Sequence, residues 1–351
     1  MSFVASVATR QPAAEGAPRV LVAGATGFAG ALAAHLLWRH PGFELIAVTG
    51  RSELGRRVDE LYPRYRVPLP IEQLELERLE RLDAAVVAYP HAAAAPTVAT
   101  LLERGARVVD LSADFRLGSL EAYEHWYGPH PRPELLAQAV YGLTELHRER
   151  IADASIVANP GCYPTASLLA LAPLARAGLI ADLVIDAKQG ISGAGRAFDE
   201  TTHLSIAGEN IVPYKVAAHR HTPEIEEQLQ LAAGASGPPL AVQFQAHLVP
   251  LDQGELVSCY VTPSRRIGAE ELGELYEQAY ADEPFVEVVQ TPPGVREVRE
   301  TNYCRVFAAA DQHTGKVIAF GAIDNLWKGT SSQAVQNLNL MFGQPETAGL
   351  Q

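Results

Sequence analysis

Cysteine is scarce in this chain, and positive charge is outnumbered by negative charge. The 351 residues include three cysteines, 28 Lys and Arg and 41 Asp and Glu, which gives a net charge of −13. A small, odd number of cysteines does not make a disulfide framework and indicates a reducing compartment. An acidic chain is poorly suited to nucleic acid or to an anionic membrane surface, because both attract Lys and Arg.

Long apolar runs are also missing. No apolar stretch reaches the roughly 18 residues that a membrane-spanning helix needs. Residues 1–17 lack the apolar run of a secretory signal, and we interpret them as a disordered tail, with a transit peptide as the alternative. The sequence therefore predicts a cytoplasmic protein without membrane or nucleic-acid partners.

The pattern of strands and helices predicts an α/β protein with two domains. Strands expected at 20–23, 43–49, 83–88 and 106–111 alternate with helices at 31–39 and 94–104, which is typical of a Rossmann-type, doubly wound parallel sheet. Longer strands follow at 183–188, 240–248, 255–262 and 303–309, and they favour an α+β domain with a mixed or antiparallel sheet. The predicted domains are 18–161 with about 325–351, whose C-terminal helix returns to the first sheet, and 162–324.

A glycine-rich loop follows the first predicted strand and opens a helix. Glycines let backbone N–H groups approach a pyrophosphate, and the helix N-terminus adds about half a positive charge. This context predicts dinucleotide binding, with a tight structural turn as the alternative. The candidate contacts are Gly24, Thr26, Gly27, Phe28, Ala29 and Gly30.

The end of the second predicted strand indicates which dinucleotide binds. An NAD site usually places an acidic residue there for the ribose hydroxyls, whereas this chain has Thr49, Arg51 and Ser52. Arg51 suits a 2′-phosphate, so we predict NADP(H). Because the acidic Glu53 is close by, NAD remains the alternative cofactor. The alternative for Arg51 is that it is a solvated charge in the loop.

A cysteine opens the predicted helix after residue 159, within NPGCYPT. Because Cys162 faces the positive end of the helix dipole, we expect a thiol pKa below the usual value of about 8.5 and a nucleophilic thiolate. A small buried hydrophobic residue is the equally open alternative. Cys259 and Cys304 lie in predicted strands and are expected in the core.

Two histidines precede another predicted helix, which has Thr222 as its N-cap and Pro223 at its first position. Since a helix N-terminus disfavours a protonated imidazole, a neutral His219 or His221 can serve as general base, with a pH limb expected near 6–7. In an extended segment the two side chains point in opposite directions, so at most one should act. No third ligand stands at metal spacing, and we expect no metal.

Arginines and a second glycine-rich loop, 189–196, suggest an anion site. Backbone donors and guanidinium groups bind carboxylates and phosphates, although each arginine has pairing with a nearby acid as its alternative. The candidate substrate-binding residues are Arg116, Ser192, Gly193, Arg196 and Arg220.

Six motifs, GATGFAG, LSADFRL, NPGCYPT, SGAGR, HRHTPEI and AIDNLWKGT, together resemble the N-acetyl-γ-glutamyl-phosphate reductases of arginine biosynthesis, over nearly the whole chain. The resemblance implies that Cys162 is the nucleophile, that His219 is the general acid/base, and that Asn325 lies beside the nicotinamide. It implies NADPH-dependent reductive dephosphorylation of N-acetyl-γ-glutamyl phosphate through a cysteine thioester. It also implies a catalytic and oligomerisation role for the second domain, in a homodimer or homotetramer.

Three other functions remain open from the sequence. Carrier-protein-linked aminoadipyl-phosphate reductases of lysine biosynthesis are close relatives, but they tend to have Asn-Ala where this chain has Tyr163-Pro164. A cysteine hydrolase would use Cys162 and His219 without a cofactor, which leaves the glycine loop unexplained. A dinucleotide-binding regulatory protein would bind the cofactor without chemistry.

Overall fold

The computed structural model describes residues 16–197, 200–234 and 240–351, so most of the tail predicted at 1–17 lies outside the described residues. The chain divides into two compact units. The first comprises Met1–Arg116, His130–Asn159 and Ser331–Gln351, and the second comprises Leu117–Pro129 and Pro160–Thr330.

The first unit contains a seven-stranded sheet in the order β3-β2-β1-β4-β5-β7-β6, in which every pairing is parallel. Its strands are β1 (Arg19–Ala23), β2 (Glu44–Thr49), β3 (Ile71–Glu72), β4 (Ala84–Val87), β5 (Arg107–Asp110), β6 (Ala139–Tyr141) and β7 (Ile156–Ala158). The central strands are continuous apolar runs because helices cover both faces of a parallel sheet. The predicted Rossmann-type sheet is confirmed.

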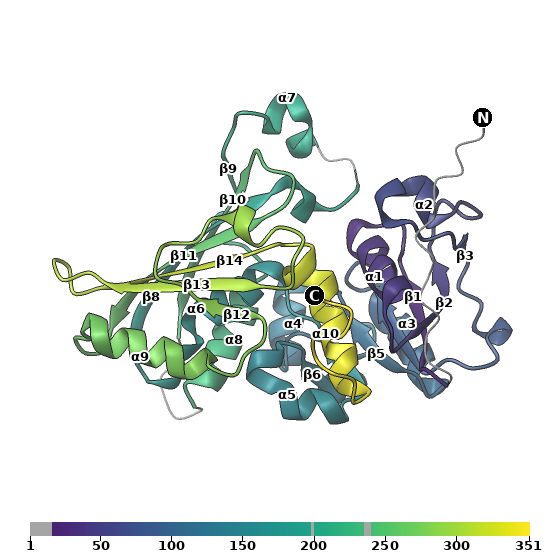
Figure 1. The fold of residues 1–351 in the computed structure, drawn as a ribbon, viewed down its shortest axis with the longest axis horizontal. Coiled ribbons are helices and arrows are strands. Elements are labelled where there is room, and N and C mark those ends of the chain that lie inside the picture. The colour runs from purple at the N-terminus through teal and green to yellow at the C-terminus, as the bar shows by residue number, and fades with distance from the viewer. Residues whose placement is uncertain (1–15, 198–199, 235–239) are drawn as a thin grey trace. The chain divides into compact units, whose positions relative to one another are not determined.

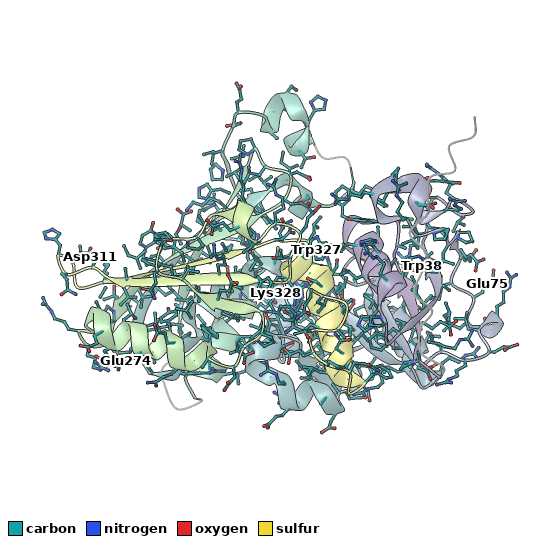
Figure 2. The ribbon with its side chains drawn as sticks, in the orientation of Figure 1. Trp38, Glu75, Glu274, Asp311, Trp327 and Lys328 are labelled. Carbon is teal, nitrogen blue, oxygen red and sulfur yellow. The ribbon has the colours of Figure 1, made fainter. Side chains whose placement is uncertain are left out.

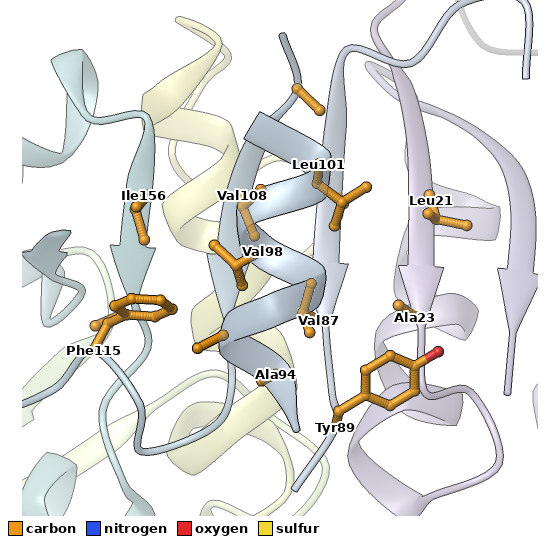
Figure 3. Packing of buried hydrophobic residues seen from close by; sticks show 14 of the residues in the cluster. Leu21, Ala23, Val87, Tyr89, Ala94, Val98, Leu101, Val108, Phe115 and Ile156 are labelled. Carbon is orange, nitrogen blue, oxygen red and sulfur yellow. The ribbon is translucent and has the colours of Figure 1, made fainter. Parts of the chain in front are cut away.

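A hydrophobic cluster holds one face of this sheet to helix α3 (Ala94–Glu103). Figure 3 shows Ala94, Val98 and Leu101 of this helix beside Val87 of β4 and Val108 of β5. The helical residues recur at intervals of three and four, which places them on one side of the helix. This packing holds α3 against β4 and β5 of the first sheet.

The remaining helices of the first unit include the one at the C-terminus. They are α1 (Phe28–Arg39), α2 (Val58–Leu61), α5 (Thr144–Asp153) and α10 (Ser332–Met341). Helix α10 is buried on nearly all sides, and its amides are paired: Gln333 donates to the carbonyl of Gly142 (3.1 Å), and Asn337 donates to Oδ1 of Asn159 (3.1 Å). The predicted return of the C-terminal helix to the first sheet is confirmed.

The second unit contains a mixed seven-stranded sheet in the order β12-β13-β14-β11-β8-β10-β9. Its strands are β8 (Ile180–Gly190), β9 (Val212–Tyr214), β10 (Val242–Val249), β11 (Glu255–Pro263), β12 (Val286–Val288), β13 (Cys304–Ala310) and β14 (Val317–Ile323). β10 pairs with β8 and β12 with β13 in parallel, and the other pairings are antiparallel. The predicted mixed sheet is confirmed. Figure 2 labels Asp311 at the tip of the β13–β14 hairpin and Glu274 on helix α9 (Ala269–Tyr280).

Helix α6 packs against this second sheet at very close range. The helices of the unit are α4 (Leu120–Tyr127), α6 (Cys162–Arg176), α7 (Leu204–Ala207), α8 (Thr222–Ala232) and α9 (Ala269–Tyr280) (Figure 1). A Cβ on Gly321 of β14 would lie 2.6 Å from the carbonyl oxygen of Ala166, so only glycine fits between this strand and α6. The side chains of α6 are almost all buried, which anchors its N-terminus.

The unit boundaries differ from the predicted domains in the segment 117–129, at residues 160–161 and at the return point. Residues 117–129, which the sequence placed in the first domain, belong to the second unit. Gly118 N–H there donates to the carboxylate of Glu227 (3.1 Å), and the hydroxyl of Tyr127 donates to the carbonyl of Arg220 (3.1 Å). The chain re-enters the first unit at Ser331 rather than near 325. No helix within the described ranges is long and apolar enough to span a bilayer.

Candidate active site

Cys162 is the first residue of α6, as the sequence predicts, with Gly161 at the N-cap. The N–H of Gly161 donates to Oε1 of Glu224 at 2.8 Å, and this carboxylate on α8 is buried. Because α6 and α8 are distant in sequence, this hydrogen bond fixes the turn before the cysteine in space. The local sequence therefore starts the helix, and a tertiary contact orients its first residue.

A pocket of about 370 Å³ within the second unit has Cys162 on its wall. Gln189, at the end of β8, also lines it and brings its amide Nε2 to 2.9 Å from the cysteine sulfur. A Cβ on Gly193 would lie 2.3 Å from that same amide, so this glycine leaves room for Gln189. The second glycine loop thus packs against the residue that contacts the sulfur.

The surroundings of the thiol contradict the predicted low pKa. Burial and the neighbouring carboxyl of Glu255 raise the pKa of Cys162 well above its ordinary value, whereas the hydrogen bonds from Gln189 and from the Tyr163 backbone oppose this. The sequence argument counted the helix dipole and omitted desolvation, which disfavours a thiolate. It also missed Glu255, which lies 93 positions later in the chain.

The two histidines both line the pocket, with ring centroids 4.9 Å apart. The opposite orientation expected for an extended segment does not apply, because the segment is a turn: the N–H of Thr222 donates to the carbonyl of His219 at 3.0 Å. Helix α8 begins at Thr222, so His221, rather than the predicted Thr222, occupies the N-cap. The ring centroid of Tyr163 lies 5.4 Å from that of His219 and 5.9 Å from that of His221.

His219 is held in its neutral form. Burial, reinforced by Lys215, lowers the pKa of His219 to about 3, so the predicted pH limb near 6–7 does not belong to this ring. Its Nδ1 accepts the backbone N–H of His221 at 3.2 Å. A neutral imidazole that accepts at Nδ1 carries its proton on Nε2. In this geometry His219 is a hydrogen-bond donor.

Lys215 and Tyr214 are pocket residues that the sequence analysis missed. Burial and the charge of Arg220 lower the pKa of Lys215, whose backbone has a positive φ of 45°. The hydroxyl of Tyr214 donates to that of Tyr163 at 3.1 Å. Neither residue belongs to a recognisable catalytic or binding motif. The signal that could have found them is that they lie a few positions before HRHTPEI in the sequence.

None of the predicted arginines is among the described residues that line this pocket. Arg116 donates from Nε to the carbonyl of Asn159 and from Nη2 to the carbonyl of Leu111, each at 2.8 Å. The guanidinium of Arg220 lies 5.2 Å from the ring centroid of Tyr127, and Arg196 is exposed beyond the 3₁₀ turn Ile191–Ala194. Among the residues that the structure describes, the predicted substrate-binding residue on the pocket wall is Gly193.

Ser192 and Asn325 brace the loop beside the pocket. Asn325 donates from Nδ2 to Oγ of Ser192 at 3.1 Å and accepts the N–H of Gly254 at 2.8 Å. Ser192 in turn donates to the carbonyl of Asp252 at 2.6 Å. Within the second unit, therefore, both side chains have internal partners.

The glycine loop of the first unit has the shape of a phosphate cradle. Gly24 has a φ of +99°, and a Cβ on Gly30 would lie 2.2 Å from the carbonyl oxygen of Gly24. Gly27 is the N-cap of α1, which leaves the first N–H groups of that helix, at Phe28 and Ala29, for a bound anion. The carbonyl of Thr26 accepts the hydroxyl of Tyr62 at 2.8 Å.

The end of β2 fits the adenosine side of a dinucleotide. The hydroxyl of Thr49 is buried and has no hydrogen-bond partner among the described residues. Arg51 is exposed and lies 4.8 Å from the ring centroid of Tyr89, and Ser52 is exposed beside it. Glu53, which kept NAD open, is paired with Arg56 at 2.8 Å. The residues present therefore suit a dinucleotide, and the exposed guanidinium of Arg51 is not held in an internal ion pair by Glu53.

The chain matches two family models, described as the semialdehyde dehydrogenase NAD binding domain (residues 19–154) and dimerisation domain (residues 162–325). Relatives named N-acetyl-gamma-glutamyl-phosphate reductase include that of Desulforudis audaxviator, 48% identical over 95% of this chain and 97% of the relative. The one from Moorella thermoacetica is 46% identical over 94% and 97%.

Solved structures show the same fold. Aspartate semialdehyde dehydrogenase II from Vibrio cholerae matches with a TM-score of 0.72 at 20% identity, over 93% of this chain and 99% of that chain. The enzyme from Candida albicans, solved with NADP, has a TM-score of 0.69 at 16% identity, over 93% and 98%. The resemblance carried by the six motifs is confirmed, and the chain belongs to the semialdehyde dehydrogenase family and, within it, to the N-acetyl-γ-glutamyl-phosphate reductases.

Proposed function

We propose that this protein reduces N-acetyl-γ-glutamyl phosphate to N-acetylglutamate semialdehyde with NADPH, releasing phosphate. The observation that carries the proposal is the thiol of Cys162 at the start of α6, on the wall of a pocket with Gln189 and His219. The relatives at 44–48% identity are named for this reaction. A cofactor-independent hydrolase gains no support, because the NAD binding domain model matches residues 19–154.

The first step forms a thioester on Cys162. Its sulfur attacks the acyl carbon, and the thiol proton and the phosphate leave together as hydrogen phosphate. Gln189 donates to the sulfur, which favours the negative charge that develops there. His219 donates from Nε2 to the acyl oxygen, which becomes negative in the tetrahedral intermediate.

The second step returns the enzyme to its starting state. Reduction of the thioester needs a hydride, which NADPH would supply when bound. His219 again donates to the oxygen of the resulting thiohemiacetal, which collapses to the semialdehyde and the Cys162 thiolate. The thiolate then regains a proton from solvent, so that one proton is consumed overall. The glycine loop, Thr49 and Arg51 would hold the dinucleotide.

Lys215 replaces the arginines as the proposed partner of the substrate's negative charge. It lines the pocket, whereas Arg116 and Arg220 engage the carbonyl of Asn159 and the ring of Tyr127. A cation that lost part of its hydration in the pocket gains most from a phosphate or carboxylate ligand. We also propose homo-oligomers, for which the dimerisation domain match is the support, and a cytoplasmic location.

Phosphate-dependent reduction of NADP with N-acetylglutamate semialdehyde tests the proposal in the reverse direction. Cys162→Ser should abolish this activity and keep cofactor binding, whereas Cys259→Ser, in the core of the second sheet, should keep activity. Activity of Cys162→Ser within tenfold of the wild type would exclude the cysteine as nucleophile. A wild-type protein that binds NADPH but reacts only with a carrier-protein-linked substrate would favour the lysine-biosynthetic alternative.

A further inference from the structure

Glu255 is the first residue of β11, and its carboxyl group interacts with the thiol of Cys162. The register of the sheet places it opposite Gln189 of β8 and Ile323 of β14. Residues that face each other in antiparallel pairs have side chains on the same face of the sheet. Glu255 therefore shares a face with Gln189, whose amide contacts the sulfur.

The carboxyl group of Glu255 is fully buried. The residue is 0% exposed, and neither carboxyl oxygen has a hydrogen-bond partner at normal geometry among the residues that the structure describes. An ionised carboxylate in such a place is costly unless a cation or several donors compensate it. The surroundings must therefore provide that compensation, or the group must be uncharged.

The charged groups around Glu255 do not provide it. Those that act on it are the thiol of Cys162 and the buried carboxyl of Asp324, both of which carry negative charge when ionised. Lys188 lies one register position away, opposite Leu256, and pairs with Asp186 at 2.7 Å. The ammonium of Lys328, which is labelled in Figure 2, lies 5.7 Å from the ring centroid of Phe285.

The same surroundings explain how the proton stays on Glu255. Burial is the largest cause and raises the pKa of Glu255 well above its ordinary value, and the charge of Asp324 adds to this, although the hydrogen bond with Cys162 opposes it. An ionised Glu255 would repel a thiolate at Cys162, and two such charges in contact cannot both persist. A protonated Glu255 removes this repulsion and adds an O–H donor on the buried side of the sulfur.

We propose that Glu255 is a neutral carboxylic acid that donates a hydrogen bond to the sulfur of Cys162 and thereby stabilises its thiolate. Gln189 does so from the pocket wall, and Glu255 from a fully buried position outside the pocket lining. Glu255 is thus a positioning residue that acts through the cysteine. The inference rests on the proposed function, in which Cys162 is the nucleophile.

The pH dependence of alkylation by iodoacetamide tests this directly, because only the thiolate reacts. Glu255→Gln keeps a neutral donor, so its rate at pH 7 should stay within about threefold of the wild type. Glu255→Leu removes the donor, and its alkylation pKa should rise by at least about one unit, which is about a tenfold slower reaction at pH 7. Cys162→Ser must lose the label, which assigns the signal to that sulfur.

Two results would overturn the proposal. If Glu255→Gln reacts about tenfold faster than the wild type, the native carboxyl is ionised and opposes the thiolate. If Glu255→Leu matches the wild type, Glu255 does not act on the sulfur at all. Neither measurement needs acyl phosphate or cofactor, so a wild type that fails as a reductase would refute the proposed function and leave this test standing.

Infrared difference spectra provide a second measurement, which does not depend on Glu255→Leu folding. The wild-type spectrum minus that of Glu255→Gln at neutral pH should contain the carbonyl band of a protonated carboxylic acid. Other buried acids, such as Asp324, cancel in the difference. A carboxylate band in its place would refute the neutral form.

Discussion

Replacing His219 by asparagine should change how the stability of the protein depends on pH. The folded-state pKa of about 3 lies below the ordinary value of about 6.5, so between these values the unfolded chain binds a proton that the folded ring does not. The free energy of unfolding therefore falls as the pH falls through this window. At pH 5 the wild type should have lost about 2 kcal/mol relative to pH 8 on account of this one ring.

Urea unfolding at pH 8 and pH 5 measures the effect. The decrease between the two pH values should be about 2 kcal/mol smaller in His219→Asn than in the wild type. His40 and Asp110 also titrate abnormally, but they are present in both proteins and cancel in the comparison. His313→Asn, on the exposed β13–β14 turn, is the matched control and should keep the wild-type decrease. An equal decrease in His219→Asn would refute the buried neutral ring.

Further substitutions test the other parts of the site. Gly193→Ala should push the amide of Gln189 off the sulfur and lower turnover at least about tenfold, whereas Gly273→Ala, with open space around it on α9, should leave turnover unchanged. Arg51→Ala should weaken NADPH binding roughly ten- to a hundredfold in fluorescence titrations, the value of a charge-assisted hydrogen bond, and leave NADH binding almost unchanged. Equal losses for both cofactors would mean that Arg51 does not bind the 2′-phosphate. Lys215→Ala should raise the KM for phosphate in the reverse reaction about tenfold, and an unchanged KM would remove Lys215 from the anion site.

The sequence predicted those features that a short stretch of chain decides by itself. The glycine loop and the starts of the helices at Cys162 and Thr222 all depend on glycine, proline and capping residues within a few positions. The alternation of strands and helices likewise indicated the parallel sheet. β14 was not assigned from the sequence, although it is a central strand of the second sheet.

The contacts that determine chemistry at the sulfur were not predictable in the same way. Gln189 was noted only as the start of a loop, and Glu255 was not noted at all, because their meeting with Cys162 depends on the pairing of β8 with β11 and on the packing of α6. The pKa of the thiol was therefore predicted in the wrong direction. The carbonyl partners of Arg116 could likewise not be recognised from sequence, and its predicted contact with the substrate stays a prediction.

An acidic chain can still bind a substrate with several negative charges if the site itself carries little negative charge. The net charge is −13, yet burial keeps the pKa values of Glu255 and Asp324 above their ordinary range, which favours their neutral forms. His219 is neutral, and Lys215 supplies a positive charge on the pocket wall. Because interactions across a poorly solvated pocket are screened little, these few groups outweigh distant surface acids. Raising the salt concentration should therefore change substrate affinity much less in the wild type than substitution of Lys215 does.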